Sequence, residues 1–271
     1  MNFDGWKSLA PYDGGGIVLA VDFTQGRPGG SFADLSDRLE VDAAFLETQV
    51  VGSARWAGLP VDPERYVETW LNGVSAHAES VVGVIGYCAG AAFASALADR
   101  LAENFSVESK LILLNPMAAT PRIMRGEFVD AVRGLGEGLS EPEIEDERRW
   151  VRDLSSGDDA DVVALGKKLL NRYRSSVDVV VDRLELEDDV ADELSSRFAS
   201  YLDYLMAAST VPLVGRRTRP VVMYDTAYEV APEFAERCVR VDVGDGHLLD
   251  SAGVADVCSA LFGQARSSVS T

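Results

Sequence analysis

The stretch 82–94 places one cysteine in a sharp turn between an apolar strand and a helix of small residues. Gly86 and Gly90 flank Cys88 at the −2 and +2 positions, giving Gly-Tyr-Cys-Ala-Gly. So tight a turn strains the backbone, and side chains at −2 and +2 would collide with the adjoining strand and helix. The helix N-terminus directs N–H groups at the sulfur and favours the thiolate. The pattern predicts a nucleophilic Cys88 in the context of the G-x-S-x-G motif. A cysteine that merely packs in the turn is the alternative.

The composition argues against several classes of partner. The 271 residues include 44 acidic and 25 basic side chains, for a formal net charge of −19. Nucleic acids and anionic membranes bind basic surfaces, so neither is an expected partner. No apolar run is long enough to span a bilayer and no leader pattern opens the chain, so we expect a cytoplasmic protein. Cys88, Cys238 and Cys258 show no C-x-x-C spacing, which predicts neither disulfides nor a metal site.

Alternating strand and helix patterns predict a mostly parallel α/β sheet with a helical insertion. The expected strands are 17–22, 44–52, 82–87, 110–117, 219–225 and 238–243, after a polar lead-in at 1–15. The strand pattern vanishes over 118–215, where helices are expected at 121–136, 141–155, 159–184 and 188–209. We therefore expect a single domain with a core of 1–117 and 216–263, a helical lid at 118–215 over the carboxyl edge of the sheet, and a disordered tail at 264–271.

A base for Cys88 has two candidates, because the chain contains only His77 and His247. His77 ends a helix just before the strand that leads to Cys88. This is the edge opposite the carboxyl ends of the strands, where ligands bind in open α/β sheets, so His77 is expected to be structural. His247 lies in a loop after the last strand and is the predicted base.

The order of nucleophile, polar strand end and C-terminal loop histidine is that of α/β-hydrolases. Over nearly its full length, the chain resembles thioesterase domains of nonribosomal peptide and polyketide synthases. The resemblance is carried by the first strand with its Gly29-Gly30-Ser31 loop, the Gly-Tyr-Cys-Ala-Gly turn, and the loop Gly-Asp-Gly-His-Leu-Leu. It implies an α/β-hydrolase fold, a substrate bound as a phosphopantetheine thioester, an acyl or peptidyl carrier protein as partner, and no other cofactor. The family includes stand-alone cysteine members that shuttle aminoacyl groups between carrier proteins.

Two positions depart from the family pattern, which has serine where Cys88 stands and commonly aspartate where Asn115 stands. The two changes are chemically compatible, since a thiol can form a thiolate–imidazolium pair that a neutral amide suffices to orient. The predicted triad is Cys88, His247 and Asn115. Asp225, at the end of a later strand, is the competing orienter. Dienelactone hydrolases, whose Gly-Tyr-Cys elbow is similar, take their acid from such a position.

The oxyanion hole is expected to combine two backbone N–H groups. Ala89 follows the nucleophile, and in α/β-hydrolases a loop after an early strand supplies the second donor. Phe23 or Thr24 occupies that position, and a plain loop is the alternative. A phosphate-binding P-loop is excluded because no Gly-Lys-Ser/Thr ends the segment.

Cysteine favours transfer over hydrolysis. Moving an acyl group from a phosphopantetheine thioester to Cys88 exchanges one thioester for another, and the acyl-enzyme stays activated toward a thiol, an amine or water. We expect acyl or aminoacyl transfer in secondary metabolite biosynthesis, such as that of antibiotics, with hydrolytic editing or release second. A dienelactone-type hydrolase acting on free small molecules and a non-catalytic binding protein are the alternatives.

Basic residues are few, and their positions suggest two roles. Arg216, Arg217 and Arg219 form the densest basic group and are a candidate contact for phosphopantetheine or a carrier protein. Arg148 and Arg152, in contrast, are expected on a solvated helix face with acidic partners four residues away.

Overall fold

The computed structural model describes residues 3–23, 30–49, 62–154, 161–225, 234–244 and 246–269. Outside these ranges lie Thr24 and Gly29, the strand end predicted at 50–52, the helix ends predicted at 155 and 159–160, and Asp245. The chain divides into two compact units. The sheet unit comprises 1–50, 62–118 and 211–271, and the helical unit comprises 51–61 and 119–210.

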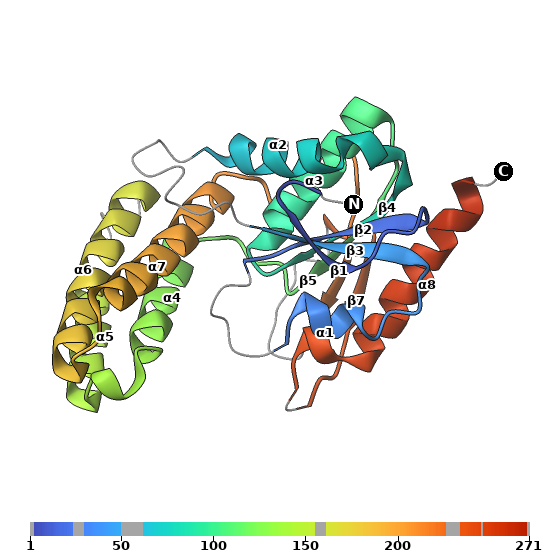
Figure 1. The fold of residues 1–271 in the computed structure, drawn as a ribbon. Helices are drawn as coiled ribbons and strands as arrows, with labels where there is room; N and C mark the ends of the chain where they lie inside the picture. The colour runs from blue at the N-terminus through green and yellow to red at the C-terminus, as the bar shows by residue number, and fades with distance from the viewer. Residues whose placement is uncertain are drawn as a thin grey trace. The chain divides into compact units, whose positions relative to one another are not determined.

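Within the described residues, one seven-stranded sheet has the order β1-β3-β2-β4-β5-β6-β7 (Figure 1). Its strands are β1 (Trp6–Ala10), β2 (Gly16–Val21), β3 (Ala43–Thr48), β4 (Val81–Tyr87), β5 (Lys110–Leu114), β6 (Val221–Tyr224) and β7 (Arg237–Arg240). Every neighbouring pair is parallel except β1–β3. The predicted mostly parallel α/β sheet is thereby confirmed.

Strand β1 corrects the expected polar lead-in at 1–15. It pairs antiparallel with β3 at the sheet edge. Trp6 fixes it there, because the indole is buried and its Nε1–H donates to the carbonyl of Trp70 at 2.8 Å. Lys7 and Ser8 are exposed, so this short edge strand lacks the apolar run that marks the central strands.

Four helices flank the sheet within the described part of this unit: α1 (Phe32–Ser36), α2 (Pro63–Val74), α3 (Gly90–Phe105) and α8 (Ala252–Val269). Helices α2 and α3 cover one face, and α1 and α8 cover the other (Figure 1). Asp62 is the N-cap of helix α2, and its side chain accepts the N–H of Glu64. Helix α8 continues past Gly263, where the sequence predicted a disordered tail. Gln264, Ala265 and Arg266 have high helix propensity, which favours this extension.

The described part of the helical unit folds into α4 (Pro121–Arg133), α5 (Glu141–Asp153), α6 (Val162–Leu184) and α7 (Asp188–Ala208), one for each predicted helix. Its interior contains a ring cluster in which Tyr173 and Phe198 have centroids 4.3 Å apart and Phe128 lies 6.3 Å from Phe198. Burial in this cluster raises the pKa of the Tyr173 hydroxyl.

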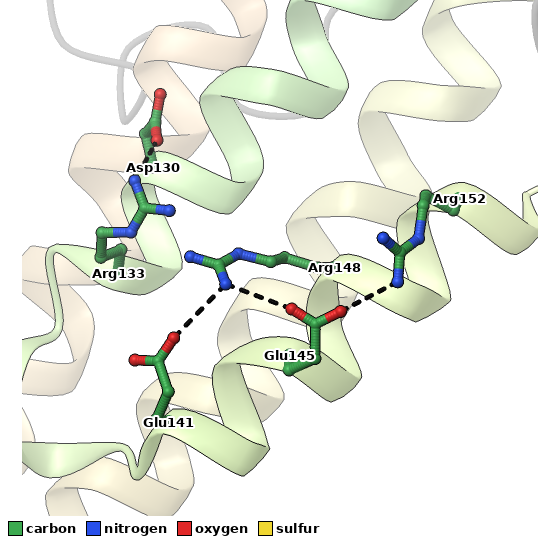
Figure 2. A network of polar contacts seen from close by, with 6 residues as sticks. All are labelled: Asp130, Arg133, Glu141, Glu145, Arg148 and Arg152. Carbon is green, nitrogen blue, oxygen red and sulfur yellow. Dashed lines mark hydrogen bonds and ion pairs between the residues drawn. The ribbon is translucent and has the colours of Figure 1, made fainter.

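Arginines on the surface of α5 pair with acids of the same helix (Figure 2). Arg148 Nη1 lies 3.1 Å from Glu145 and 3.4 Å from Glu141, and Arg152 Nη2 lies 2.9 Å from the other oxygen of Glu145. The partners are thus three and seven residues away, whereas a spacing of four was predicted. The two arginines lower the pKa of Glu145 through these hydrogen bonds. Such exposed pairs each contribute little to stability, so the predicted role as a solvated helix face fits them.

The packing of α3 on β4 leaves no room for a side chain at Gly86. A Cβ built there would lie 2.6 Å from the Cβ of Ala94 and 2.8 Å from the Cα of Ala91. The second of these atoms belongs to the α3 backbone and cannot rotate away. Helix α3 can therefore approach the strand only because residue 86 is glycine.

Gly86→Ala should lower the free energy of unfolding by about 1–3 kcal/mol, because α3 must move away from β4. Urea unfolding followed by circular dichroism measures this. Gly263→Ala in α8 is the matched control, since nothing lies within 4 Å of the position that a Cβ would take there. This control should be neutral or slightly stabilising. A Gly86→Ala protein as stable as the wild type would contradict the packing described.

Candidate active site

Cys88 occupies the elbow between β4 and α3 with a left-handed backbone, at φ 52°. Its N–H donates to the carbonyl of Leu114 at 3.0 Å, and its own carbonyl accepts the N–H groups of Met117 at 3.1 Å and Ala91 at 3.2 Å. A left-handed conformation is unfavourable for a non-glycine residue, and these three hydrogen bonds help to hold it. The predicted strained strand–turn–helix is confirmed, while the nucleophilic role of the half-buried sulfur stays a prediction.

The oxyanion-hole residues lie at neighbouring strand ends. Ala89 is the N-cap of α3, and its methyl side chain makes no capping hydrogen bond to the first turn. Val21 on β2 pairs with Gly86 on β4. Two residues further along each chain segment, Phe23 and Cys88 are therefore at the same level of the sheet. Phe23 is buried. These positions are consistent with the predicted donors Ala89 and Phe23, whose role stays a prediction. Thr24 lies outside the described residues.

His247 precedes a short 3₁₀ helix, η6 (Leu248–Asp250), and its ring is held by several contacts. Nε2 lies 2.9 Å from the hydroxyl oxygen of Tyr87, and Nδ1 accepts the backbone N–H of Leu249 at 3.2 Å. The rings of His247 and Tyr87 also contact each other, with centroids 5.3 Å apart. A Cβ at Gly30 would lie 3.1 Å from Nδ1, so the backbone of Gly30 lies close to the ring.

These contacts fix the tautomer of a neutral His247. The N–H of Leu249 can only donate, so Nδ1 must offer a lone pair. The single ring proton then resides on Nε2 and is donated to the hydroxyl oxygen of Tyr87. Sequence reasoning missed Tyr87. The available signal was a hydroxyl-bearing side chain at the carboxyl end of a central strand, directly before the nucleophile.

Asn115 and Asp225, predicted as competing orienters, are hydrogen-bonded to each other. Asn115 Nδ2 donates to Asp225 Oδ2 at 2.7 Å, and Asn115 Oδ1 accepts the backbone N–H of Asp225 at 3.2 Å. Asn115 itself has φ 42°, and its N–H donates to the carbonyl of Met223 on β6 at 2.9 Å. The two residues thus form one polar unit at adjacent strand ends. Which of them orients His247 stays a prediction, since Nδ1 faces Leu249 in this conformation.

His77 has the structural environment predicted for it. It lies in the 3₁₀ helix η2 (Ser75–Ser80), just before β4 begins. Its ring centroid is 5.6 Å from that of Phe3 and 5.3 Å from that of Tyr12. An aromatic cluster at the amino edge of the sheet therefore surrounds it.

Arg216 and Arg217 are fixed to α3 through their backbone. The carboxylate of Asp99 accepts the N–H of Arg216 at 2.5 Å and that of Arg217 at 3.1 Å. The guanidinium of Arg217 also lies 3.4 Å from Glu103. Both contacts are with the second half of α3, away from the helix N-terminus beside Cys88.

Arg219 lies at the amino edge of the sheet. It precedes β6, and its Nη2 donates to the carbonyl of Ala235 at 3.2 Å. Val221 on β6 and Ile85 on β4 pair with the same residue of β5, so they are at the same level of the sheet. Measured along the strand direction, Arg219 therefore lies five residues before Cys88. At about 3.3 Å per residue this is roughly 16 Å. The structure does not bring the three arginines to Cys88, and carrier contact by them stays a prediction.

Among the described residues, no group of three or more His, Cys, Asp or Glu side chains could hold a metal ion. In the same part of the chain, no helix is both long and apolar enough to cross a membrane.

No protein-family profile and no curated protein matches the chain. Solved structures do match. The Vlm2 thioesterase domain carrying genetically encoded 2,3-diaminopropionic acid, bound with a dodecadepsipeptide, is 19% identical over 96% of this chain and 97% of its own, with a TM-score of 0.50. The haloalkane dehalogenase DbeA-M1 loop variant from Bradyrhizobium elkanii is 12% identical over 98% of this chain and 94% of its own, with a TM-score of 0.54.

A third structure is the four-domain nonribosomal peptide synthetase holo-AB3403, bound to AMP and glycine. It is 14% identical over 96% of this chain, with a TM-score of 0.56, and the match covers 20% of the synthetase. Together with the sheet order and the Cys88 elbow, these likenesses establish the α/β-hydrolase fold for this chain.

The hydrogen bonds between Asn115 and Asp225 predict coupled effects on the site. Asn115→Ala and Asp225→Ala should each slow acylation of Cys88 by a simple acyl thioester about 10²-fold, because His247 loses its orienting group. The double variant should be no slower than the worse single variant, since either change breaks the same unit. Stopped-flow acylation rates measure this. Two single variants as fast as the wild type would contradict a triad containing either residue.

Proposed function

We propose that this chain is an acyltransferase that takes an acyl or aminoacyl group from a carrier-protein phosphopantetheine thioester onto Cys88. It then passes the group to an acceptor thiol or amine. The observation that carries the proposal is the left-handed Cys88 at the N-terminus of α3. This geometry places the cysteine in a sharp turn directly before the N-terminus of α3, where the positive end of the helix dipole stabilises a thiolate.

Acylation begins when Cys88 loses its proton to Nε2 of His247, which requires the ring proton to move to Nδ1 and the imidazole to leave Tyr87. The thiolate attacks the thioester carbonyl, and a bond forms between its sulfur and the carbonyl carbon. Backbone N–H groups of Ala89 and Phe23 would stabilise the negative oxygen of the tetrahedral intermediate. The bond to the phosphopantetheine sulfur then breaks, and that thiolate takes the proton back from His247. The acyl group is now on Cys88 and His247 is again neutral.

Deacylation follows the same addition to the acyl carbon and cleavage of its bond to sulfur, with a second nucleophile. An acceptor thiolate forms a new thioester and releases Cys88 with little change in free energy, whereas water would release a free acid. Likeness in fold to a thioesterase domain and to a nonribosomal peptide synthetase supports a carrier-bound substrate, and the cysteine supports transfer.

A second candidate is hydrolysis of free esters or lactones, as in dienelactone hydrolases. The observation that favours it is the Asp225 carboxylate, which the amide of Asn115 holds at a strand end of the site. A carboxylate strengthens an imidazole base, as activation of water requires. This candidate predicts turnover of small esters without any carrier protein.

Intact-protein mass spectrometry after mixing with acyl-pantetheine thioesters tests the proposed transfer. We expect an acyl adduct on Cys88 that pantetheine thiol or a second carrier protein removes. The Cys238→Ser protein is the appropriate background, because Cys238 is exposed. Cys258 should not react, since complete burial raises the pKa of its thiol to about 12.

Cys88→Ala in the same background is the control and should form no adduct. Rapid release of free acid without an adduct would favour a hydrolase. A wild-type protein that neither forms an adduct nor turns over any thioester would exclude the proposed function.

A further inference from the structure

Tyr87 places a hydroxyl group on the nitrogen through which a catalytic histidine acts as a base. The distance between the Tyr87 hydroxyl oxygen and His247 Nε2 is 2.9 Å, and Tyr87 is 9% exposed. The residue ends β4, so the strand that carries Cys88 also positions this hydroxyl. The contact is therefore built into the elbow.

The opposite nitrogen reinforces this arrangement. Nδ1 accepts the N–H of Leu249, which places the proton of the neutral ring on Nε2. To accept a proton at Nε2, His247 must first move its ring proton to Nδ1, which ends the contact with the Leu249 N–H, and must break the hydrogen bond to Tyr87. Before acylation, the Cys88 thiol proton can drive this change. Once Cys88 carries an acyl group, that thiol proton is gone and no longer competes with Tyr87 for the ring.

Acceptor thiols and water differ in what they need from His247. A thiol has a pKa near 8.5, so a useful fraction is ionised in solution and attacks without a base. Water has a pKa of about 15.7 and attacks a thioester well only when a base takes its proton. A histidine held by Tyr87 thus disfavours water while leaving a thiolate acceptor free to react.

We infer that Tyr87 is a positioning residue that protects the acyl-enzyme from hydrolysis by occupying Nε2 of His247. The inference rests on the proposed acyl transfer and adds the means by which transfer prevails over hydrolysis. In the suppressed step, a water proton would move to Nε2, its oxygen would bond the acyl carbon, and the carbon–sulfur bond to Cys88 would break. In the permitted step, an acceptor thiolate forms the new bond and Cys88 leaves as a thiolate.

Tyr87→Phe tests the inference, because it keeps the ring and removes the hydroxyl. After acylation with an acyl-pantetheine thioester, mass spectrometry follows loss of the adduct with and without acceptor thiol. The ratio of hydrolysis to thiol transfer should rise about tenfold or more in the variant. Formation of the adduct in the same assay shows that the variant is folded. Tyr66→Phe is the matched control, since Tyr66 is also buried but contacts Trp70 and Phe93.

The tautomer gives a second readout that does not depend on turnover. In His77→Gln protein labelled with ¹⁵N-histidine, the one remaining histidine should show a protonated Nε2 and an unprotonated Nδ1. A protonated Nδ1 in the neutral ring, or an unchanged ratio in Tyr87→Phe, would overturn the inference while the adduct on Cys88 still supports the proposed function. Absence of any adduct in the wild type would overturn both.

Discussion

The close packing of α3 against β4 is the constraint on which the site depends. Gly86 admits the helix, and the helix begins immediately after the strand, so the chain must turn within Cys88 and Ala89. That turn forces Cys88 into a left-handed backbone at φ 52°. The same geometry places Cys88 directly before the N-terminus of α3, the positive end of the helix dipole. One steric requirement thus sets both the exposure of the cysteine and the electrostatics around it.

Parallel strands bring the remaining polar groups to the same edge of the sheet. Asn115 follows β5 and Asp225 follows β6, and the two side chains meet because these strands are neighbours. His247 arrives through the loop before α8 and is held by Tyr87, the last residue of β4. The candidate site therefore assembles from four distant parts of the chain, each placed by the end of a strand or the start of a helix.

Short-range sequence patterns predicted the parts of the structure that neighbouring residues determine. The elbow was predictable because two glycines flanking Cys88, between a strand pattern and a helix pattern, are typical of a tight strand–turn–helix. The helices of 119–210 were predictable because their apolar residues recur at helical spacing over long segments. Strand β1 was missed because a single buried tryptophan holds it at the sheet edge. The hydrogen bonds of Asn115 to Asp225 and of Tyr87 to His247 join residues 110 and 160 positions apart, so no local pattern encodes them.

The most direct test of Cys88 as the nucleophile is the pH dependence of its alkylation by iodoacetamide. The measurement uses Cys238→Ser protein, with Cys258 excluded by its burial. We predict a midpoint below the value of about 8.5 for a free thiol, because the N-terminus of α3 stabilises the thiolate. A midpoint at or above that value, or a Cys88 that does not react, would contradict the central claim.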